Sequence, residues 1–331
     1  MTQIEIAELV KDTNVCEIAT KTIKNMNMSD NEKVVAEQLD EWARKIGETG
    51  HDANHEIAAF VTRTINEEFY DAPNELLDSM FDRGSIGEFD DYEAIIQPTK
   101  NTLVAYEAAH GGNVKKSYLD FTGLKPVWKN RQLETQLSFV DLRRNGWKSV
   151  ALLTDYATRA LENAMFYDIF NAIDAAITSG AENYIAEAGA LPSQATMDAV
   201  ALYLNDRNQG GSTIVALSKY IQGASKLQGY NSSEMLNELH RNGRLGMYDG
   251  VAMHPISAAK RQGDGSLLIP DKRMYGIAGK IGALDMKGEV HTYETENNNK
   301  ETIDLKIADF TYGYSFNKDS LENVCKVVFA K

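Results

Sequence analysis

The 331-residue sequence has no apolar run near the ~18 residues that a membrane-spanning helix needs, so it predicts no integral membrane protein. Its N-terminus, MTQIEIAELVKD, lacks the basic and apolar regions of a secretion signal. Its two cysteines, Cys16 and Cys325, lie at opposite ends of the chain, which excludes a disulfide framework and favours a reducing compartment. The remaining composition, 43% hydrophobic and 25% charged, is that of an ordinary soluble protein with room for two domains.

The net charge of −14 is unevenly distributed along the chain. Residues 1–100 hold 22 acidic and 9 basic side chains, whereas residues 101–331 hold 26 and 25. Binding to nucleic acid through bulk charge needs basic patches, so this balance argues against it. The skew indicates an N-terminal segment with a task of its own.

Residues 1–94 have the pattern of short acidic helices. Ser29 and Glu32 have the spacing of a capping box, and the helix that follows is expected to end at Gly47. A third helix is expected to end at Gly84. A second helix, between the helices that end at Gly47 and Gly84, has these residues on one face: Ile57, Phe60, Val61, Thr64, Ile65 and Phe69. Because each apolar stripe is narrow, each helix should cover a larger body or pair with another chain.

The rest of the chain alternates between strand-like and helical segments. Two strands, near 103–106 and 137–140, are expected to flank a long, mildly basic loop, and such loops are usually functional. Residues 148–179 contain no glycine or proline, which predicts one helix of about 48 Å with a face of mostly small residues. Residues 193–279 predict a compact α/β unit, followed by a hairpin turning at 297–299 and a final strand.

Few residues suggest chemistry. His51 and His55 are four apart, as in the HExxH motif of zinc proteases, but Asp52 is shorter than the required glutamate and no third ligand is indicated. The glycines before Lys115 are misplaced for a phosphate-binding loop, and Glu187 reads as a surface or turn acid. The sequence therefore predicts no metal, no cofactor and no enzyme.

The order of these parts resembles the major capsid protein of tailed bacteriophages, which has the Hong Kong 97-like fold. The resemblance covers roughly residues 95–331. It is carried by the passage ETQLSFVDLRRNGWKSVALLTDYATRALENAMFYDIFNAI, by ELHRNGRLGMYDGVAMHP followed by GSLLIPDKRMYGIAGK, and by EVHTYET with DLKIADFTYGYSF.

The resemblance implies an α+β fold with an extended loop, a long spine helix in a peripheral domain, an α/β axial domain and a helical N-terminal segment. Residues 1–94 would be an acidic arm or a built-in scaffold-like segment, and 95–146 the extended-loop hairpin. The peripheral domain would contain 147–190 and 280–322, and the axial domain 191–279 and 323–331. Such a loop overlaps a neighbouring subunit, which gives these assembly-interface candidates: Tyr118, Phe121, Trp128, Arg143 and Arg144.

The implied function is that of a major capsid subunit that self-assembles, through hexamers and pentamers, into an icosahedral head enclosing phage DNA without sequence-specific binding. Scaffolding, portal and decoration proteins are the other expected partners, and no membrane is expected. The protein would reside in the virion after assembly in the bacterial host cytoplasm. Three alternatives remain open at this point: an encapsulin-like nanocompartment shell, a metal-dependent hydrolase using His51 and His55, and another helical structural or adaptor protein.

Overall fold

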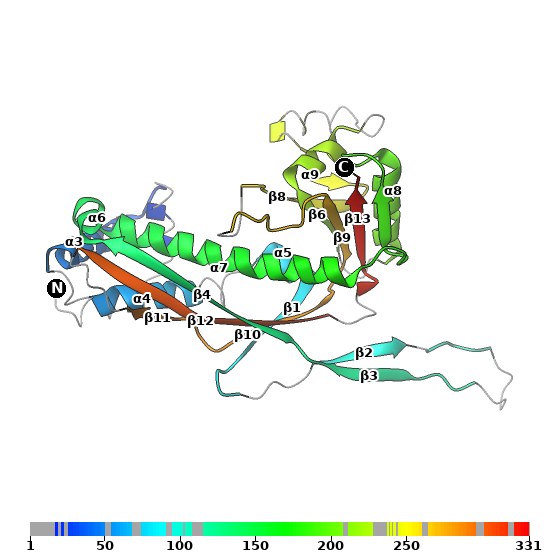
Figure 1. Cartoon of the computed structure of the whole chain (residues 1–331), viewed down its shortest axis with the longest axis horizontal. Helices are drawn as coiled ribbons and strands as arrows, with labels where there is room; N and C mark the ends of the chain where they lie inside the picture. The colour runs from blue at the N-terminus through cyan, green and yellow to red at the C-terminus, as the bar shows by residue number, and fades with distance from the viewer. Residues whose placement is uncertain are drawn as a thin grey trace.

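Helix α7 (Trp147–Ala176) runs along the length of the molecule, and the other elements are arranged against it (Figure 1). Its 30 residues confirm the predicted long helix, although it ends at Ile177, which is extended, and not at Gly180. The expected small-residue face is wrong. The alanines at 160, 175 and 176 are exposed, and the buried face carries large side chains such as Trp147, Phe166 and Phe170.

The computed structural model describes residues 17–18, 21–22, 26–49, 54–67, 74–90, 95–101, 103–107, 115–207, 211–227, 237, 239, 241–242, 244–259, 264–295, 301–316 and 321–330, without the side chains of 95–101 and 119–124. Besides α7, the helices are α3 (Asp30–Thr49), α4 (Asn54–Asn66), α5 (Glu75–Met80), α6 (Phe139–Asn145), α8 (Gln194–Asp206) and α9 (Ser218–Ser225). Within these residues, no helix is long and apolar enough to cross a membrane.

A five-stranded sheet packs against α7. Its strands are β1 (Phe81–Ile86), β4 (Val127–Ser138), β10 (Gly282–Lys287), β11 (His291–Glu294) and β12 (Thr302–Phe316). The long β12 pairs antiparallel with β4 on one side and with β10 and β11 on the other. This confirms the predicted strand pairing between the two C-terminal segments, while the turn at 297–299 lies outside the described residues. An irregularity between Ile307 and Phe310 places Asp309 at φ 64°, a bulge that bends the long strand.

A six-stranded sheet forms the core of a second unit, at the upper right of Figure 1. Its order is β5-β13-β9-β6-β8-β7, with α8 and α9 packed beside it. The strands are β5 (Tyr184–Glu187), β6 (Ser212–Leu217), β7 (Met247–Tyr248), β8 (Val251–Ile256), β9 (Arg273–Ala278) and β13 (Val324–Phe329). The alternation of helices and strands predicted for residues 193–279 is present, and the final strand β13 joins the same sheet. Because β5 pairs with β13, residues 184–187 belong to this sheet, and the expected boundary at 190 is wrong.

The N-terminal helices form a layer on the start of α7, and they are not a separate arm. The capping box is confirmed, because the Ser29 amide donates to Glu32 and the Glu32 amide to Ser29 Oγ. Helix α3 then continues through Gly47, where α6 packs so closely that a Cβ would lie 2.9 Å from the Arg143 side chain. The Trp147 ring packs on Trp42 and, edge to face at 4.4 Å, on Phe60.

A hydrogen bond and a strand pairing fix this layer to the rest of the fold. Asp40 of α3 accepts a hydrogen bond from the Trp147 amide at 3.1 Å, so a carboxylate sits at the positive N-terminus of α7. After α5, the chain enters β1, which pairs parallel with β10, and Gly84 lies inside this strand and does not end a helix. The described part of the N-terminal segment therefore supplies an edge strand of the five-stranded sheet and packs on α7, whereas the sequence predicted an arm or a built-in scaffold-like segment.

The predicted loop is a two-stranded hairpin of β2 (Ile95–Asn101) and β3 (Leu119–Leu124) that projects from the body (Figure 1). The outgoing strand precedes the expected 103–106, which is not a strand. The returning chain runs through both β3 and β4, and Phe139 and Val140 begin α6 and do not end a strand. Ser138 caps that helix by accepting from the Val140 amide, which explains the change at this point.

Candidate assembly surfaces

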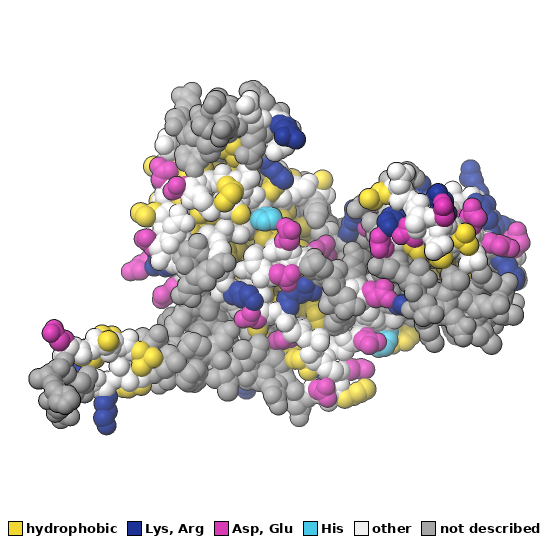
Figure 2. All heavy atoms as spheres, turned by 180° about the vertical axis from the view of Figure 1, so that it is seen from behind, with side chains coloured by type: hydrophobic (Ala, Val, Ile, Leu, Met, Phe, Trp, Pro, Cys, Tyr) yellow, Lys and Arg dark blue, Asp and Glu magenta, His cyan; other side chains and the backbone are white. Residues whose placement is uncertain are grey.

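The projecting hairpin exposes apolar side chains at its far end. Tyr118 is 59% exposed, Val104 56% and Tyr106 43%. Seen from behind, the hairpin carries hydrophobic, basic and acidic side chains on a segment that stands clear of the body (Figure 2). A monomer gains nothing from apolar groups held in water, so this surface has the character of an interface. Phe121 lies in β3 opposite Pro98, and its side chain is outside the described residues.

Trp128, expected in the loop, lies instead on β4 within the five-stranded sheet. It pairs with Gly313 of β12, and a Cβ at 313 would come within 2.7 Å of its ring. The Lys287 ammonium is 5.9 Å from the ring centroid. The ring is partly buried, so Trp128 packs within its own chain. The glycine opposite explains why an indole fits here.

Arg143 and Arg144 are brought together as exposed side chains in the last turn of α6. Cations are favoured there because the carbonyl groups at a helix C-terminus carry partial negative charge. Arg44 of α3 donates to the Arg143 carbonyl at 2.9 Å, so the N-terminal layer holds this basic end in place. Both arginines lie at the opposite end of the body from the projecting hairpin (Figure 1).

Two carboxylates of α7, six residues apart, join the helix to the two sheets. Asp168 pairs bidentately with Arg131 of β4, with an N–O distance of 2.6 Å, and accepts a 2.5 Å hydrogen bond from the Tyr312 hydroxyl of β12. The carboxylate beside Arg131 raises the pKa of the guanidinium, and burial raises the pKa of Tyr312. Asp168 therefore fixes the two longest strands to the helix.

Asp174 makes the corresponding joint to the six-stranded sheet. It pairs with Arg273 at 3.0 Å and Lys326 at 2.7 Å, and accepts a 2.9 Å hydrogen bond from Tyr275. Burial alone would raise the pKa of Asp174, but its bonds to Lys326 and Tyr275 lower it overall. Lys326 also donates to the Asp174 and Ile177 carbonyls at the end of α7. This places a buried cation at the negative end of the helix.

Glu187 is a buried carboxylate and not the surface acid that was expected. It accepts hydrogen bonds from the Ser193 and Thr196 hydroxyls and the Ser193 amide at the start of α8, and from the Gly189 amide in the preceding loop. The hydroxyls and amides lower its pKa to about 2. The sequence signal was the Ser193–Thr196 spacing of a helix start, which provides donors for an acid.

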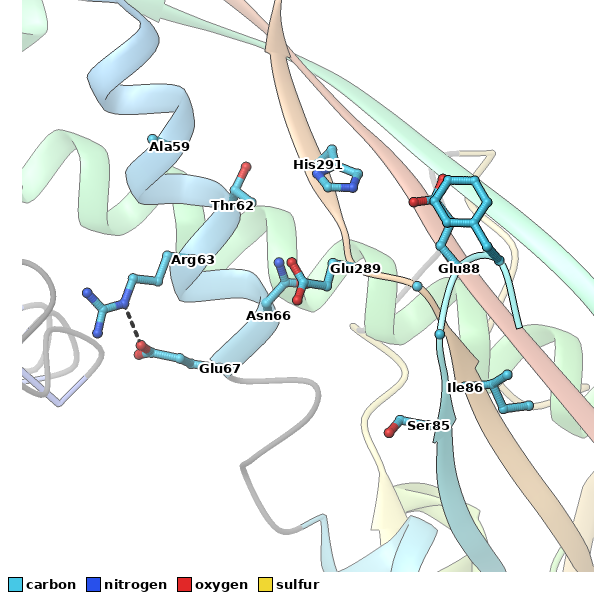
Figure 3. A pocket seen from close by; sticks show the side chains of 13 residues that line it. Ala59, Thr62, Arg63, Asn66, Glu67, Ser85, Ile86, Glu88, Glu289 and His291 are labelled. Carbon is cyan, nitrogen blue, oxygen red and sulfur yellow. Dashed lines mark hydrogen bonds and ion pairs between the residues drawn. The ribbon is translucent and has the colours of Figure 1, made fainter. Parts of the chain in front are cut away.

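A groove of about 750 Å³ lies between α4, the turn after β1 and the link from β10 to β11 (Figure 3). One wall is fixed by Asn66, which exchanges two hydrogen bonds with the Val290 backbone, and by Thr62, which accepts from the Thr292 amide. Arg63 of α4 forms an ion pair at 2.7 Å with Glu67, the residue that follows the helix. The groove is lined by Ala59, Thr62, Arg63, Asn66, Glu67, Ser85, Ile86, Gly87, Glu88, Phe89, Gly288, Glu289 and His291.

Residues 5–311 match the model of a family described as "SPbeta prophage-derived putative capsid protein YonB". The chain therefore belongs to the YonB family. This match spans the N-terminal layer, the hairpin, α7, the six-stranded sheet and most of the five-stranded sheet, so the N-terminal segment is part of the family and not an addition to it.

Several solved phage structures resemble this YonB-family chain weakly. A structure from Gordonia phage Cozz aligns with a TM-score of 0.49 at 12% identity, covering 75% of this chain and 85% of that one. The mature capsid of bacteriophage PhiM1 aligns with a TM-score of 0.48 at 11% identity, covering 79% of this chain and 90% of that one. The capsid of an empty GTA particle aligns with a TM-score of 0.45 at 12% identity, covering 75% of this chain and 88% of that one. No curated protein matches the sequence.

Membership of the YonB family confirms the predicted resemblance to phage capsid proteins and makes the role structural and not enzymatic. The protein is a subunit of multimeric capsid shells and belongs to the virion. His55 is exposed on α4, and His51 lies outside the described residues. Among the described residues no group of His, Cys, Asp and Glu could hold a metal ion. The nanocompartment and hydrolase alternatives are not favoured.

Proposed function

We propose that this protein is a major capsid subunit with the Hong Kong 97-like architecture, which self-assembles into an icosahedral head around phage DNA. The observation that carries the proposal is the contrast between a well-packed body and a hairpin that holds apolar side chains in water. A shell subunit needs such a projection because each copy must overlap its neighbours. The exposed residues of the hairpin, Tyr118 among them, are the proposed contacts.

The parts of the fold correspond to the domains of such a subunit. The five-stranded sheet, α7 and the N-terminal layer would form the peripheral domain, and the six-stranded sheet the axial domain. Asp168 and Asp174 would then keep the angle between the two domains, because each fixes one sheet to the same helix. Arg143 and Arg144, at the far end of the body from the hairpin, stay proposed interface residues.

Other partners follow from this role. Copies would form hexamers and pentamers, assisted by scaffolding and portal proteins and joined by decoration proteins, in the bacterial host cytoplasm. DNA would be enclosed without sequence-specific contacts.

The acidic N-terminal layer would face the interior of the shell. Exposed acids on α3, namely Asp30, Glu37, Glu41 and Glu48, would repel packaged DNA and keep it free to move. A shell reconstruction with α3 on its outer surface would contradict this orientation.

The proposal is tested by expressing the full chain and examining it by negative-stain microscopy and light scattering. Closed shells or capsomer rings are the expected result. A protein that stays monomeric at high concentration, alone and with its phage's scaffolding protein, would refute it.

A further inference from the structure

The groove beside α4 has the chemistry of a site for a cationic segment that carries an aromatic ring. Within it, Arg63 and Glu67 neutralise each other, which leaves Glu88 and Glu289 as the exposed carboxylates of the rim. Phe89 stands beside them with 93% of its surface exposed. An aromatic ring so exposed on the lining of a groove is typical of an interface anchor.

The far end of the projecting hairpin has the complementary chemistry. Lys115 and Lys116 are both exposed, and Tyr118 follows two residues later. Two ammonium groups can meet two carboxylates, while the tyrosine and the lysine stems supply apolar surface for Phe89. The hairpin projects away from its own body in Figure 1, so the groove that it reaches is that of another molecule.

We infer that Lys115 and Lys116 of one copy dock in the groove of a second copy, against Glu88 and Glu289, with Tyr118 beside Phe89. This inference rests on the proposed function and specifies which surface of the neighbour receives the hairpin. The contact is heterologous, since one patch meets a different patch, and such contacts close into rings when the rotation between copies allows. The groove wall is rigid, because Asn66 and Thr62 bind the backbone of 290 and 292.

Two charge-reversed variants of the full chain test the docking. The groove variant carries Glu88→Lys and Glu289→Lys, and the tip variant carries Lys115→Glu and Lys116→Glu. Each should fold normally, because all four side chains are exposed. Each alone should need roughly tenfold more protein than the wild type before light scattering detects assembly, because attraction is replaced by repulsion.

Mixing the two variants identifies the occupant. The basic tips of the groove variant fit the acidic grooves of the tip variant. The acidic tips of the tip variant likewise fit the basic grooves of the groove variant. An equimolar mixture should therefore assemble near the wild-type concentration, and both chains should be found in the same particles. Rescue only when all four changes are in one chain would mean that the hairpin occupies its own groove, and would overturn the inference.

A matched control reverses two exposed acids of the six-stranded unit, Glu182→Lys and Glu322→Lys. It should assemble like the wild type. An equal defect in this control, or normal assembly of both test variants, would overturn the docking site while leaving the proposed function intact. Failure of the wild type itself to assemble would refute the proposed function, and the inference with it.

Discussion

Two segments that precede α7 differ sharply in how they treat apolar residues. The N-terminal layer places Trp42, Phe60 and their neighbours against Trp147, where they are almost fully buried. The hairpin that follows holds Val104, Tyr106 and others in water. The sequence predicts apolar residues in both segments, yet only those of the N-terminal layer stabilise the monomer. The second has apolar surface that is useful only between molecules. Folding and assembly can therefore be disturbed separately.

The largest effect is expected in the N-terminal layer. Phe60→Ala removes a 3% exposed ring that packs on Trp147. It should lower the free energy of unfolding by about 3–5 kcal/mol, measured by chemical denaturation, and assembly should fall with stability. Phe89→Ala is the control because it removes a phenyl ring from an exposed position. It should change the free energy of unfolding by less than about 0.5 kcal/mol. Equal losses of unfolding free energy in the two variants would contradict the difference between buried and exposed apolar residues.

The joint at Asp168 should give the second-largest effect, because it ties the root of the hairpin strand to α7. Asp168→Ala leaves Arg131 and the Tyr312 hydroxyl without their acceptor. We expect a loss of about 2–3 kcal/mol, less than for a fully buried pair because Arg131 is partly exposed. Asp155→Ala breaks an exposed pair with Arg159 on the same helix and should cost about 0.5 kcal/mol or less. A thermal melt compares the two.

A smaller effect is expected from the cap of α3. Ser29→Ala removes the hydroxyl that accepts from the Glu32 amide, at a cost of about 0.5–1 kcal/mol. Lys21 and Ser29 lower the pKa of Glu32 to about 2 in the folded chain, below its unfolded value. Its stabilisation is therefore complete above an unfolded pKa of about 4.3 and is lost as the pH falls toward 2.

Denaturation at several pH values measures this contribution. Glu32→Gln should have less of that acid-dependent loss than the wild type, and an identical pH profile would contradict the assignment.

The smallest effect on folding belongs to the hairpin. Val104→Ser combined with Tyr106→Ser should change the unfolding free energy by less than about 0.5 kcal/mol, since both side chains are exposed. Assembly, followed by light scattering, should nevertheless require a higher protein concentration. Tyr156→Ser, an exposed tyrosine on α7, serves as a control for loss of surface apolar area. A hairpin variant that destabilised the monomer would place this segment in the folding core.

The sequence predicted the elements whose pattern is local. The capping box at Ser29, the long helix and the alternation in β12 all follow from periodicity within one segment. It failed where a partner distant in sequence decides the outcome. Residues 81–86 become a strand because β10, two hundred residues later, offers a sheet edge. Trp128 is held on β4 by the space over Gly313, and Glu187 is buried because the start of α8 supplies donors.

The candidate site was predictable to a similar degree. Tyr118, Arg143 and Arg144 are exposed, as an interface role requires, and that role stays a prediction. The groove could not be predicted, because its walls come from 59–67, 85–89 and 288–291, which no spacing connects. The joints at Asp168 and Asp174 were missed for the same reason, since their partners lie on strands up to about 150 residues away.

The distant pairing of β1 has a consequence for the order of events during synthesis. The hairpin is complete once residue 124 has been made, but the groove needs residues up to 291, including β10, which pairs with β1. At ~5–20 residues per second, roughly 10–30 seconds separate the two events. A nascent chain can thus bind through its hairpin tip to another copy, but its own groove is not yet formed. We expect polymerisation to begin only from finished chains, which keeps growing shells free of ribosome-bound subunits.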